Sequence, residues 1–417
     1  MRCPPPLLLT GSSLLLLGGL ALSAPAELQP VEPCTHFRAD RQAFFGDLHV
    51  HTALSLDAAT QATRTRPDEA YAFATGQPLS IQPFDEAGQG LRTIRLERPL
   101  DFAAVTDHAE LLGEVEACSD PSLPGHRTLG CRVYRSWPRA AFFTMNSRMN
   151  WGWSIPLCGP GRERCLSAAR RPWQEIRAAA AAWNRDTGDC DFTTFNGYEW
   201  TGGRGGGSIH RNVIFASEMV PEQPVDFYAA PEATALWQQL GEQCVAPDCD
   251  FIVIPHNSNL SDGQMFRPPA DAAEAQRRVD AERLVEVMQH KGSSECWPGS
   301  ADELCGFEPL PYSTFVEKYT FKQTPPGPDA GWIRSVLLAG LAEDINPYIF
   351  GLIGSSDTHL GAPGLVNEVD FPGHGGAGKP TRDELPPGLP DELEFNPGGL
   401  AGVWAEENTR ASLFAAL

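Results

Sequence analysis

Basic side chains, long apolar runs and the short motifs of several enzyme classes are scarce in this sequence. Its 417 residues include 32 Lys and Arg against 53 Asp and Glu, which gives a net charge of −21. A nucleic acid partner would require clustered cations to neutralise its phosphates, so this balance argues against one. Beyond residue 26, no segment approaches the roughly 18 continuous apolar residues of a membrane span. We therefore expect an acidic, soluble mature chain that acts on a small molecule.

Motifs of the serine hydrolases and of nucleotide-binding loops are also missing. No G-x-S-x-G elbow is present, so a serine nucleophile of the α/β-hydrolase type lacks support. The glycine-rich segment 202–208 resembles a phosphate cradle, but it has no G-K-[ST] sequence. We interpret it as a flexible loop over a site.

The N-terminus is typical of an exported protein. Arg2 precedes an apolar stretch from Leu7 to Leu22, and small residues follow up to Ala26. This order is that of a secretory signal peptide, and cleavage after Ala26 fits the A-x-A rule. We therefore expect a signal peptide over 1–26, a polar lead over 27–39 and one domain over 40–417. The mature protein is expected in the periplasm or outside the cell.

The cysteines agree with export. Of the 11 cysteines, Cys3 would leave with the signal peptide, so an even number of ten remains. In an oxidising compartment such a set predicts disulfides, and the absence of any C-x-x-C disfavours the alternative of a zinc ribbon. Sequence neighbours suggest the following pairs, although proximity alone does not establish them: Cys118/Cys131, Cys158/Cys165, Cys244/Cys249, Cys296/Cys305 and, as the remainder, Cys34/Cys190.

Seven short apolar runs rich in Val, Ile and Phe predict buried strands. They span residues 43–49, 101–108, 192–199, 210–215, 251–256, 284–288 and 349–354. Helical patterns lie between them over 171–185, 236–243 and 272–282, the first with Pro172 near its start. This alternation predicts a parallel α/β architecture, with Pro- and Gly-rich loops over 361–378 and 386–399.

The chain ends in an apolar helical pattern over 411–417, without a C-terminal cap or a polar tail. Two interpretations stay open. One is a frayed last helix, and the other is a β/α unit whose next strand is missing. In the second case the domain would be an incomplete barrel.

The ten histidines are distributed unevenly relative to the predicted strands. In α/β folds, sites are assembled at the ends of strands, so histidines at those positions are candidate ligands. Five of them end a strand-like run and one opens a run: His49, His51, His108, His256 and His359, and then His210.

The segment Asp-Leu-His-Val-His is the centre of this pattern. Because alternate residues of a strand share a face, His49 and His51 can bind one cation together. Asp57, Glu199 and Asp357 add carboxylates near other strand ends, with Glu199 as the natural bridging ligand. These donors exceed the needs of one ion, so we expect two or three divalent metals. Zn, Mn and Fe all suit such mixed nitrogen and oxygen ligation.

Each of these residues also has a simpler interpretation. Asp47 and Asp107 could cap a turn or support a ligand through hydrogen bonds. His210 could be a core or surface histidine, and His290 is expected to line the site rather than to bind metal. Glu286 would point into the site in one register of its strand and away from it in the other, so no role is assigned to it. Three histidines in irregular segments are expected at the surface: His36, His126 and His374.

Six segments form an ordered set of motifs along the chain. They are Phe-Gly-Asp-Leu-His-Val-His-Thr at 45–52 with Ser-Leu-Asp at 55–57, Arg-Pro-Leu-Asp-Phe through Thr-Asp-His-Ala-Glu at 98–110, Asn-Gly-Tyr-Glu-Trp-Thr at 196–201, His-Arg-Asn at 210–212, Ile-Pro-His-Asn at 254–257, and Gly-Ser-Ser-Asp-Thr-His at 354–359. As a set, they resemble the PHP (polymerase and histidinol phosphatase) superfamily, in particular an exported branch still named as a domain of unknown function. The resemblance covers residues 40 to 410.

The resemblance implies a distorted seven-stranded β/α barrel, TIM-like, with two or three metals at its rim. It implies three groups of ligands. The first is His49, His51, Glu199 and Asp357; the second is Glu199, His210 and His256; and the third is Asp57, His108 and His359. Relatives in this branch continue beyond the point where this chain ends.

The leading expectation for the function is hydrolysis of a small anionic phosphate ester by metal-activated water. Arg211 and Arg204 are expected to hold a phosphoryl oxygen, Asn257 to donate to the substrate, and Asp107 to orient a histidine or relay a proton. Two alternatives stay open. The same metals could hydrolyse an amide, lactone, sulfate or carboxylic ester, or the chain could bind a metal or ligand without catalysis.

Overall fold

The computed structural model describes residues 34–204, 207–245, 249–307, 331–369, 371–374 and 397–417. The expected signal peptide lies outside these ranges, as do residues 27–33 of the polar lead and most of the predicted loop 386–399. The described ranges all belong to one unit of the fold, Pro33–Leu417.

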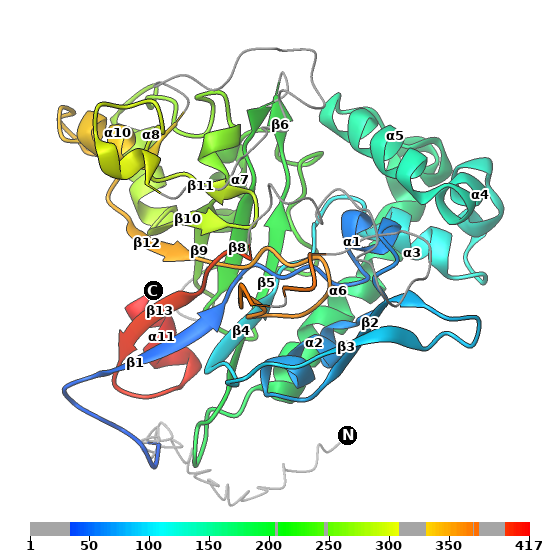
Figure 1. The fold of residues 1–417 in the computed structure, drawn as a ribbon. Coiled ribbons are helices and arrows are strands. Elements are labelled where there is room, and N and C mark those ends of the chain that lie inside the picture. The colour runs from blue at the N-terminus through cyan, green and yellow to red at the C-terminus, as the bar shows by residue number, and fades with distance from the viewer. Residues whose placement is uncertain (1–33, 205–206, 246–248, 308–330, 370, 375–396) are drawn as a thin grey trace, which may run out of the picture. The chain divides into compact units, whose positions relative to one another are not determined.

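Two sheets form the centre of this mixed α/β fold (Figure 1). The larger has six strands, in the order β13 (Ala401–Ala405), β1 (Gln42–Asp47), β4 (Phe102–Val105), β5 (Thr193–Trp200), β8 (Arg211–Phe215) and β9 (Phe251–Pro255). The smaller has three, in the order β11 (Gly292–Ser293), β10 (Leu284–Gln289) and β12 (Gly351–Gly354). Two short ladders lie apart from them: β2 (Leu79–Phe84) with β3 (Gly90–Ile94), and β6 (Gly203–Arg204) with β7 (Gly207–Ser208).

The strand directions bring one end of every central strand to a common rim. β1, β4 and β5 run parallel to one another, whereas β8 is antiparallel to β5 and β9 is antiparallel to β8. The start of β8 therefore lies beside the carboxyl ends of β5 and β9, since Arg211 pairs with both Trp200 and Pro255. Any polar residue that follows β4 or β9, or precedes β8, is thereby placed at this rim.

The two sheets contact each other at both edges. A parallel bridge joins His256, just after β9, to Glu286 of β10. At the other edge, the backbone N–H of Gly354 donates to the carbonyl of Leu400 over 3.3 Å, and that of Gly399 donates to Ser355 over 2.9 Å. The larger sheet thus curls toward the smaller one instead of lying flat.

A single apolar cluster fills the concave side of the curled sheets. Because side chains alternate along a strand, every second residue of the central strands contributes to it. Its members on these strands and just beyond them are Phe44, Leu48, Phe102, Ala104, Phe195, Ile214, Ile252, Ile254, Leu284, Ile353, Ala401 and Val403. The intervening residues, such as Ala103, Val213 and Val285, pack in a second cluster together with helix residues. Burial on both faces explains why the strands appear in the sequence as continuous apolar runs.

Helices cover the outer face of the sheets and extend from it, except α11, which packs against the concave-side cluster. They are α1 (Leu56–Thr60), α2 (Pro67–Ala74), α3 (Leu112–Ser119), α4 (Leu129–Ser136), α5 (Pro138–Asn150), α6 (Glu163–Trp183), α7 (Ala233–Gln243), α8 (Ala272–Ala281), α10 (Ile333–Gly340) and α11 (Arg410–Ala416). The helices predicted over 236–243 and 272–282 are confirmed. The helix predicted from 171 begins instead at Glu163, so Pro172 lies inside α6 rather than at its first turn.

All seven predicted strands are present, but their arrangement differs from the prediction. The wholly parallel architecture is wrong, because β8 is antiparallel to both of its neighbours. Only ten residues separate β5 from β8, which is too short for a crossover helix, so the chain turns back as in a hairpin. A seven-stranded TIM-like barrel is not confirmed, since the strands form a six-stranded and a three-stranded sheet.

The C-terminal segment is part of the larger sheet. β13 pairs antiparallel with β1 from Gln42 to Gly46. The hydroxyl of Thr409 caps the N-terminus of α11, and the fully buried Leu413 of this helix joins the concave-side cluster. The segment that the sequence left between two interpretations is therefore an ordered helix packed on the sheet.

Five disulfides link the cysteines in the pairs that the sequence suggested. Four of them close short loops, and Cys34–Cys190 spans 156 residues. This set is consistent with an extracellular protein. Within the described ranges, no helix combines the length and the apolar character that a membrane crossing requires.

Candidate metal centre

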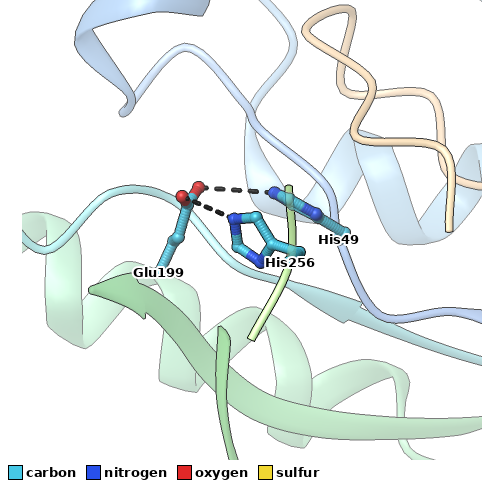
Figure 2. Close-up of side chains that lie close together, drawn as sticks. All are labelled: His49, Glu199 and His256. Carbon is cyan, nitrogen blue, oxygen red and sulfur yellow. Dashed lines mark hydrogen bonds and ion pairs between the residues drawn. The ribbon is translucent and has the colours of Figure 1, made fainter. Parts of the chain in front are cut away.

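All nine predicted metal ligands converge at the common rim of the strands. Strand alternation explains why several of them point inward. Glu199 shares the inner face of β5 with Phe195, and His256 continues the inner face that Ile252 and Ile254 form on β9. Figure 2 shows His49, Glu199 and His256 as they meet there. Side chains from six separate segments of the sequence therefore share one small volume.

The first group of donors has the spacing of a metal site. Nε2 of His49 lies 3.3 Å from Oε2 of Glu199 and 3.3 Å from Oδ1 of Asp357. Nε2 of His51 lies 3.2 Å and 3.1 Å from the same two oxygens. Ligands about 2.0 Å from a tetrahedral zinc ion are separated by roughly 3.3 Å. These two nitrogens and two oxygens therefore fit around one divalent cation.

Glu199 links this group to a second one through its other oxygen. Oε1 lies 2.7 Å from Nδ1 of His210 and 3.0 Å from Nε2 of His256. Oε1 thus faces His210 and His256, whereas Oε2 faces His49, His51 and Nδ1 of His108, which lies 3.2 Å away. This is the arrangement that a carboxylate bridging two cations requires, as the sequence predicted for Glu199.

A third group lies beside the first. Oδ2 of Asp57 is 2.6 Å from Nε2 of His108 and 2.9 Å from Nε2 of His359. The rings of His108 and His359 both stack on that of His51, with centroids 4.5 Å and 4.6 Å away. The structure therefore brings together each of the three ligand groups that the resemblance implied.

Hydrogen bonds on the far side of the rings fix their orientation. Nδ1 of His49 donates to the carboxylate of Glu286, whose two oxygens both lie 3.1 Å away. Nδ1 of His359 donates to the backbone carbonyl of Asp357 over 2.9 Å, and Nδ1 of His108 contacts the hydroxyl of Thr201. With the proton held on Nδ1, the lone pair of Nε2 is directed at the cluster, as in established metal sites.

Asp107 supports His51 through a serine. The hydroxyl of Ser55 donates to Oδ1 of Asp107 over 2.8 Å, because an ionised carboxylate can only accept. Its oxygen is then free to accept from Nδ1 of His51, 3.0 Å away, and from the backbone N–H of His108. Thr52 donates to Asp107 through both its N–H and its hydroxyl. The chain of bonds selects one tautomer of His51.

Asp47 holds two parts of the rim together rather than pointing into the cluster. It accepts from the backbone N–H groups of His49, Ser356 and Gly364 and from the hydroxyl of Ser356. Burial raises the pKa of this carboxyl, whereas these donors lower it. Asp47 therefore ties the end of β1 to the segment after β12, which is the supporting role that the sequence left open for it.

The electrostatics of the cluster are dominated by buried carboxylates. Burial alone would raise the pKa of Glu199, but His108, His256 and His210 hold it well below the usual value. Burial alone would lower the pKa of His51, whereas the carboxylates of Asp57, Asp357 and Glu199 raise it to about 10. These buried carboxylates are stabilised only by positive charge beside them. Either protons on the histidines or metal cations can supply that charge.

His256 behaves differently from His51. Burial, together with the neighbouring His49, lowers the pKa of His256 to about 3. The ring therefore stays neutral near pH 7, and a neutral imidazole is the form that binds a metal.

The cluster opens to solvent on one side. The side chains of His49, His51, Glu199, His256 and Asp357 are at most 1% exposed. His210 is 26%, Asp57 15% and His108 13% exposed. A ligand that enters the centre therefore passes these three residues, and we call this side the mouth of the site.

The structure does not support the prediction that Arg211 holds a phosphoryl oxygen of the substrate. Its guanidinium is buried and donates to Glu282 over 2.7 Å and to the carbonyls of Ile209 and Met265. Since His210 faces the cluster, the next residue along the strand faces the opposite side of the sheet. Arg211 therefore has no path to a substrate. The side chain of Arg204 lies outside the described residues.

Asn257 lies beside a candidate ligand, but its side-chain atom without a hydrogen bond is an acceptor, whereas the sequence predicted a donor to the substrate. It follows His256 in a left-handed backbone conformation, with φ of 59°, and its side chain is buried. Oδ1 accepts no hydrogen bond within the described part of the chain. A polar group remains available there, next to a candidate ligand.

Three residues surround the outer oxygen of Asp357, of which the sequence analysis placed only His290 at the site and missed Gln289 and Lys291. Gln289, His290 and Lys291 all approach Oδ2, the first over 2.6 Å and the second over 2.9 Å. His374, expected at the surface, is instead 1% exposed, with its ring 4.2 Å from that of His290. The irregular segment that carries it packs against the rim, which its glycine-rich sequence did not indicate. His36 is exposed and His126 is half-buried.

Comparisons with known proteins place the chain in a family. A solved structure from Bacteroides vulgatus ATCC 8482, described as a two-domain protein containing a predicted PHP-like metal-dependent phosphoesterase, is similar over 93% of this chain and 67% of its own. The TM-score is 0.37 and the sequence identity is 11%. No curated protein matches the chain. The family model "Protein of unknown function (DUF3604)" matches residues 38–417, so the chain belongs to that family.

Proposed function

We propose that this chain is a metal-dependent hydrolase and that phosphate esters are its substrates. One observation carries the proposal: Nε2 of His49 and Nε2 of His51 each lie 3.1 to 3.3 Å from both Oε2 of Glu199 and Oδ1 of Asp357. Divalent cations held at such a site acidify water and stabilise the negative charge that develops on attacking and leaving oxygens.

The charge of the ligand set favours an anionic substrate. The nine candidate ligands include three carboxylates, Asp57, Glu199 and Asp357, and the other six are histidines. Two divalent cations already outweigh three negative charges, and a third would add to the excess. A phosphate ester is therefore attracted to the loaded site more than a neutral amide or carboxylic ester is.

The residues around the ligands provide orientation and exclude water. Glu286 and the Ser55–Asp107 pair hold His49 and His51 with Nε2 toward the cluster. The innermost ligands are shielded from solvent, so a charge that develops beside them is poorly screened.

We further propose that the two sheets correspond to a distorted PHP-type barrel. Both edges of the larger sheet contact the smaller one, and residues of both sheets fill one concave-side cluster. We also infer that residues 1–26 direct export, which the five disulfides support.

Elemental analysis of the purified protein, combined with a panel of chromogenic esters, tests the function. The wild type is expected to contain two or three equivalents of Zn, Mn or Fe and to hydrolyse phosphate esters. His49→Ala and Asp357→Ala are expected to lose metal and turnover while they stay folded. His36→Ala, at an exposed position away from the rim, serves as the control and keeps both.

The other outcomes separate the alternatives. Retained turnover in His49→Ala or Asp357→Ala would contradict the assignment of the site. Turnover only of sulfate or acyl esters would keep the metal centre but change the substrate class. Bound metal without turnover of any ester would indicate a binding protein.

A further inference from the structure

The outer oxygen of Asp357 attracts more donors than it can accept. Its Oδ1 faces Nε2 of His49 and of His51 on the inner side of the carboxylate. Oδ2 faces Nε2 of Gln289, Nε2 of His290 and Nζ of Lys291. A carboxylate oxygen offers about two lone-pair positions in its plane. Three consecutive residues therefore compete for one oxygen.

Lys291 is the member of this trio with donors to spare. An ammonium group carries three N–H donors, and its ion pair with Asp357 uses one of them. Gln289 and His290 are each 1% exposed, whereas the side chain of Lys291 is 17% exposed. That value matches those of Asp57 and His108 at the mouth. Lys291 is also the one lysine of the chain that lies within the described residues.

A single carboxylate, that of Asp357, separates the ammonium of Lys291 from the candidate metal centre. Nζ contacts the same carboxylate whose other oxygen faces His49 and His51. A backbone bond holds the residue in place, since Nδ2 of Asn259 donates to its carbonyl over 3.2 Å. A tetrahedral anion that reaches the metal centre from the mouth comes within range of this ammonium.

We propose that Lys291 recognises the substrate by binding a non-bridging oxygen of its tetrahedral oxyanion. The inference rests on the proposed function. It assigns to Lys291 the contact with a phosphoryl oxygen that the sequence analysis predicted for Arg211. In the loaded protein the cations share the charge of Asp357, so the ion pair with Lys291 weakens and the ammonium turns toward the anion. Lys291 then acts by direct contact, not by positioning Asp357.

Binding of inorganic phosphate to the metal-loaded protein, measured by calorimetry, tests the inference without any substrate. The variant is Lys291→Met, which keeps the length of the side chain and removes its charge. The matched control is Arg334→Met, which removes a cation from an exposed ion pair with Glu295, outside the residues of the site. Metal content is measured for every sample. Sulfate is titrated in parallel, and the anion whose binding depends more on Lys291 identifies the ester class.

Lys291→Met is expected to weaken phosphate binding about tenfold to a hundredfold, the range for a hydrogen bond to a charged group. Arg334→Met should leave phosphate affinity unchanged at saturating metal, and Lys291→Arg should restore most of the affinity that Lys291→Met loses. Equal losses in the two methionine variants, or no loss in Lys291→Met, would overturn the inference. So would a wild type that binds metal but no phosphate. A wild type that takes up no metal would overturn the proposed function as well.

Discussion

Both carboxylate oxygens of Glu286 lie 3.1 Å from Nδ1 of His49. The side chains of the two residues are at most 1% exposed, so neither has an alternative partner in water. Burial raises the pKa of Glu286, while the charge of His49 lowers it. A carboxylate behind a metal-ligating histidine orients the ring and makes it a better donor to the metal. Glu286 is therefore a positioning residue for the first group of ligands.

Replacement of Glu286 by Gln tests this role. The amide oxygen still accepts from Nδ1 of His49, but the negative charge is lost, so His49 becomes a weaker ligand. We expect metal affinity to fall about tenfold to a hundredfold, the usual range for such partners. Competition with a chelator measures the change. Glu295→Gln, at an exposed salt bridge with Arg334, is the control. Unchanged affinity in Glu286→Gln would show that the contact does not tune the metal.

The relay from Asp107 through Ser55 to His51 makes a second prediction. In Asp107→Asn, the amide oxygen has to keep the place of Oδ1, because the backbone N–H of Thr52 donates there, so Ser55 donates to a neutral and weaker acceptor and the proton of His51 is held less firmly on Nδ1. We expect this variant and Ser55→Ala to bind metal at least about tenfold more weakly than the wild type. Ser55→Thr keeps the hydroxyl and should recover most of the affinity. Chelator competition compares the four proteins. If Asp107→Asn binds as the wild type does, the relay does not select the tautomer.

Strand alternation explains both a success and a failure of the sequence analysis. His108, Glu199, His210 and His256 all continue the inner face of a strand, so their convergence follows from the pattern of apolar residues alone. The same rule assigns the residue after His210 to the outer face, where Val213 and Phe215 pack. The error on Arg211 came from reading its chemistry without applying this alternation.

Arg211 and Glu282 form a buried ion pair whose loss should cost stability. Arg211→Met leaves the charge of Glu282 without its nearest partner, a change that costs about 3–5 kcal/mol in buried pairs. The double variant Arg211→Met with Glu282→Leu should recover only part of this loss, because it removes the buried charge of Glu282 but also takes that partner from Arg278, 3.6 Å away. Urea unfolding measures both. Folded Arg211→Met should keep the metal content of the wild type. A loss of metal without a loss of stability would place Arg211 in the site after all.

Other features could not be predicted because they depend on contacts between distant segments. Glu286 shares a strand face with Leu284, but only the bridge to His256 shows that this face meets the rim. His374 belongs to an irregular segment, and its burial results from packing against His290. The antiparallel pairing of β9 with β8 could not be predicted either. Helix α7 precedes β9, as a crossover helix between two parallel strands would. The local pattern of apolar residues identifies each strand and the face that it buries. Which strands pair along their edges depends on the tertiary fold.

Removal of metal should lower thermal stability, because it leaves Asp57, Glu199 and Asp357 buried together. Histidines can compensate these charges only by taking up protons, against the cost of their own burial. A cation that binds only the folded protein stabilises it by about 2.7 kcal/mol at a hundredfold excess over its Kd. We therefore expect the Tm to fall after treatment with a chelator and to rise again, in a concentration-dependent way, when metal is restored. His49→Ala should show a smaller rise on addition of metal, and His36→Ala should follow the wild type. A Tm that does not respond to metal in the wild type would mean that these carboxylates are balanced by protons alone.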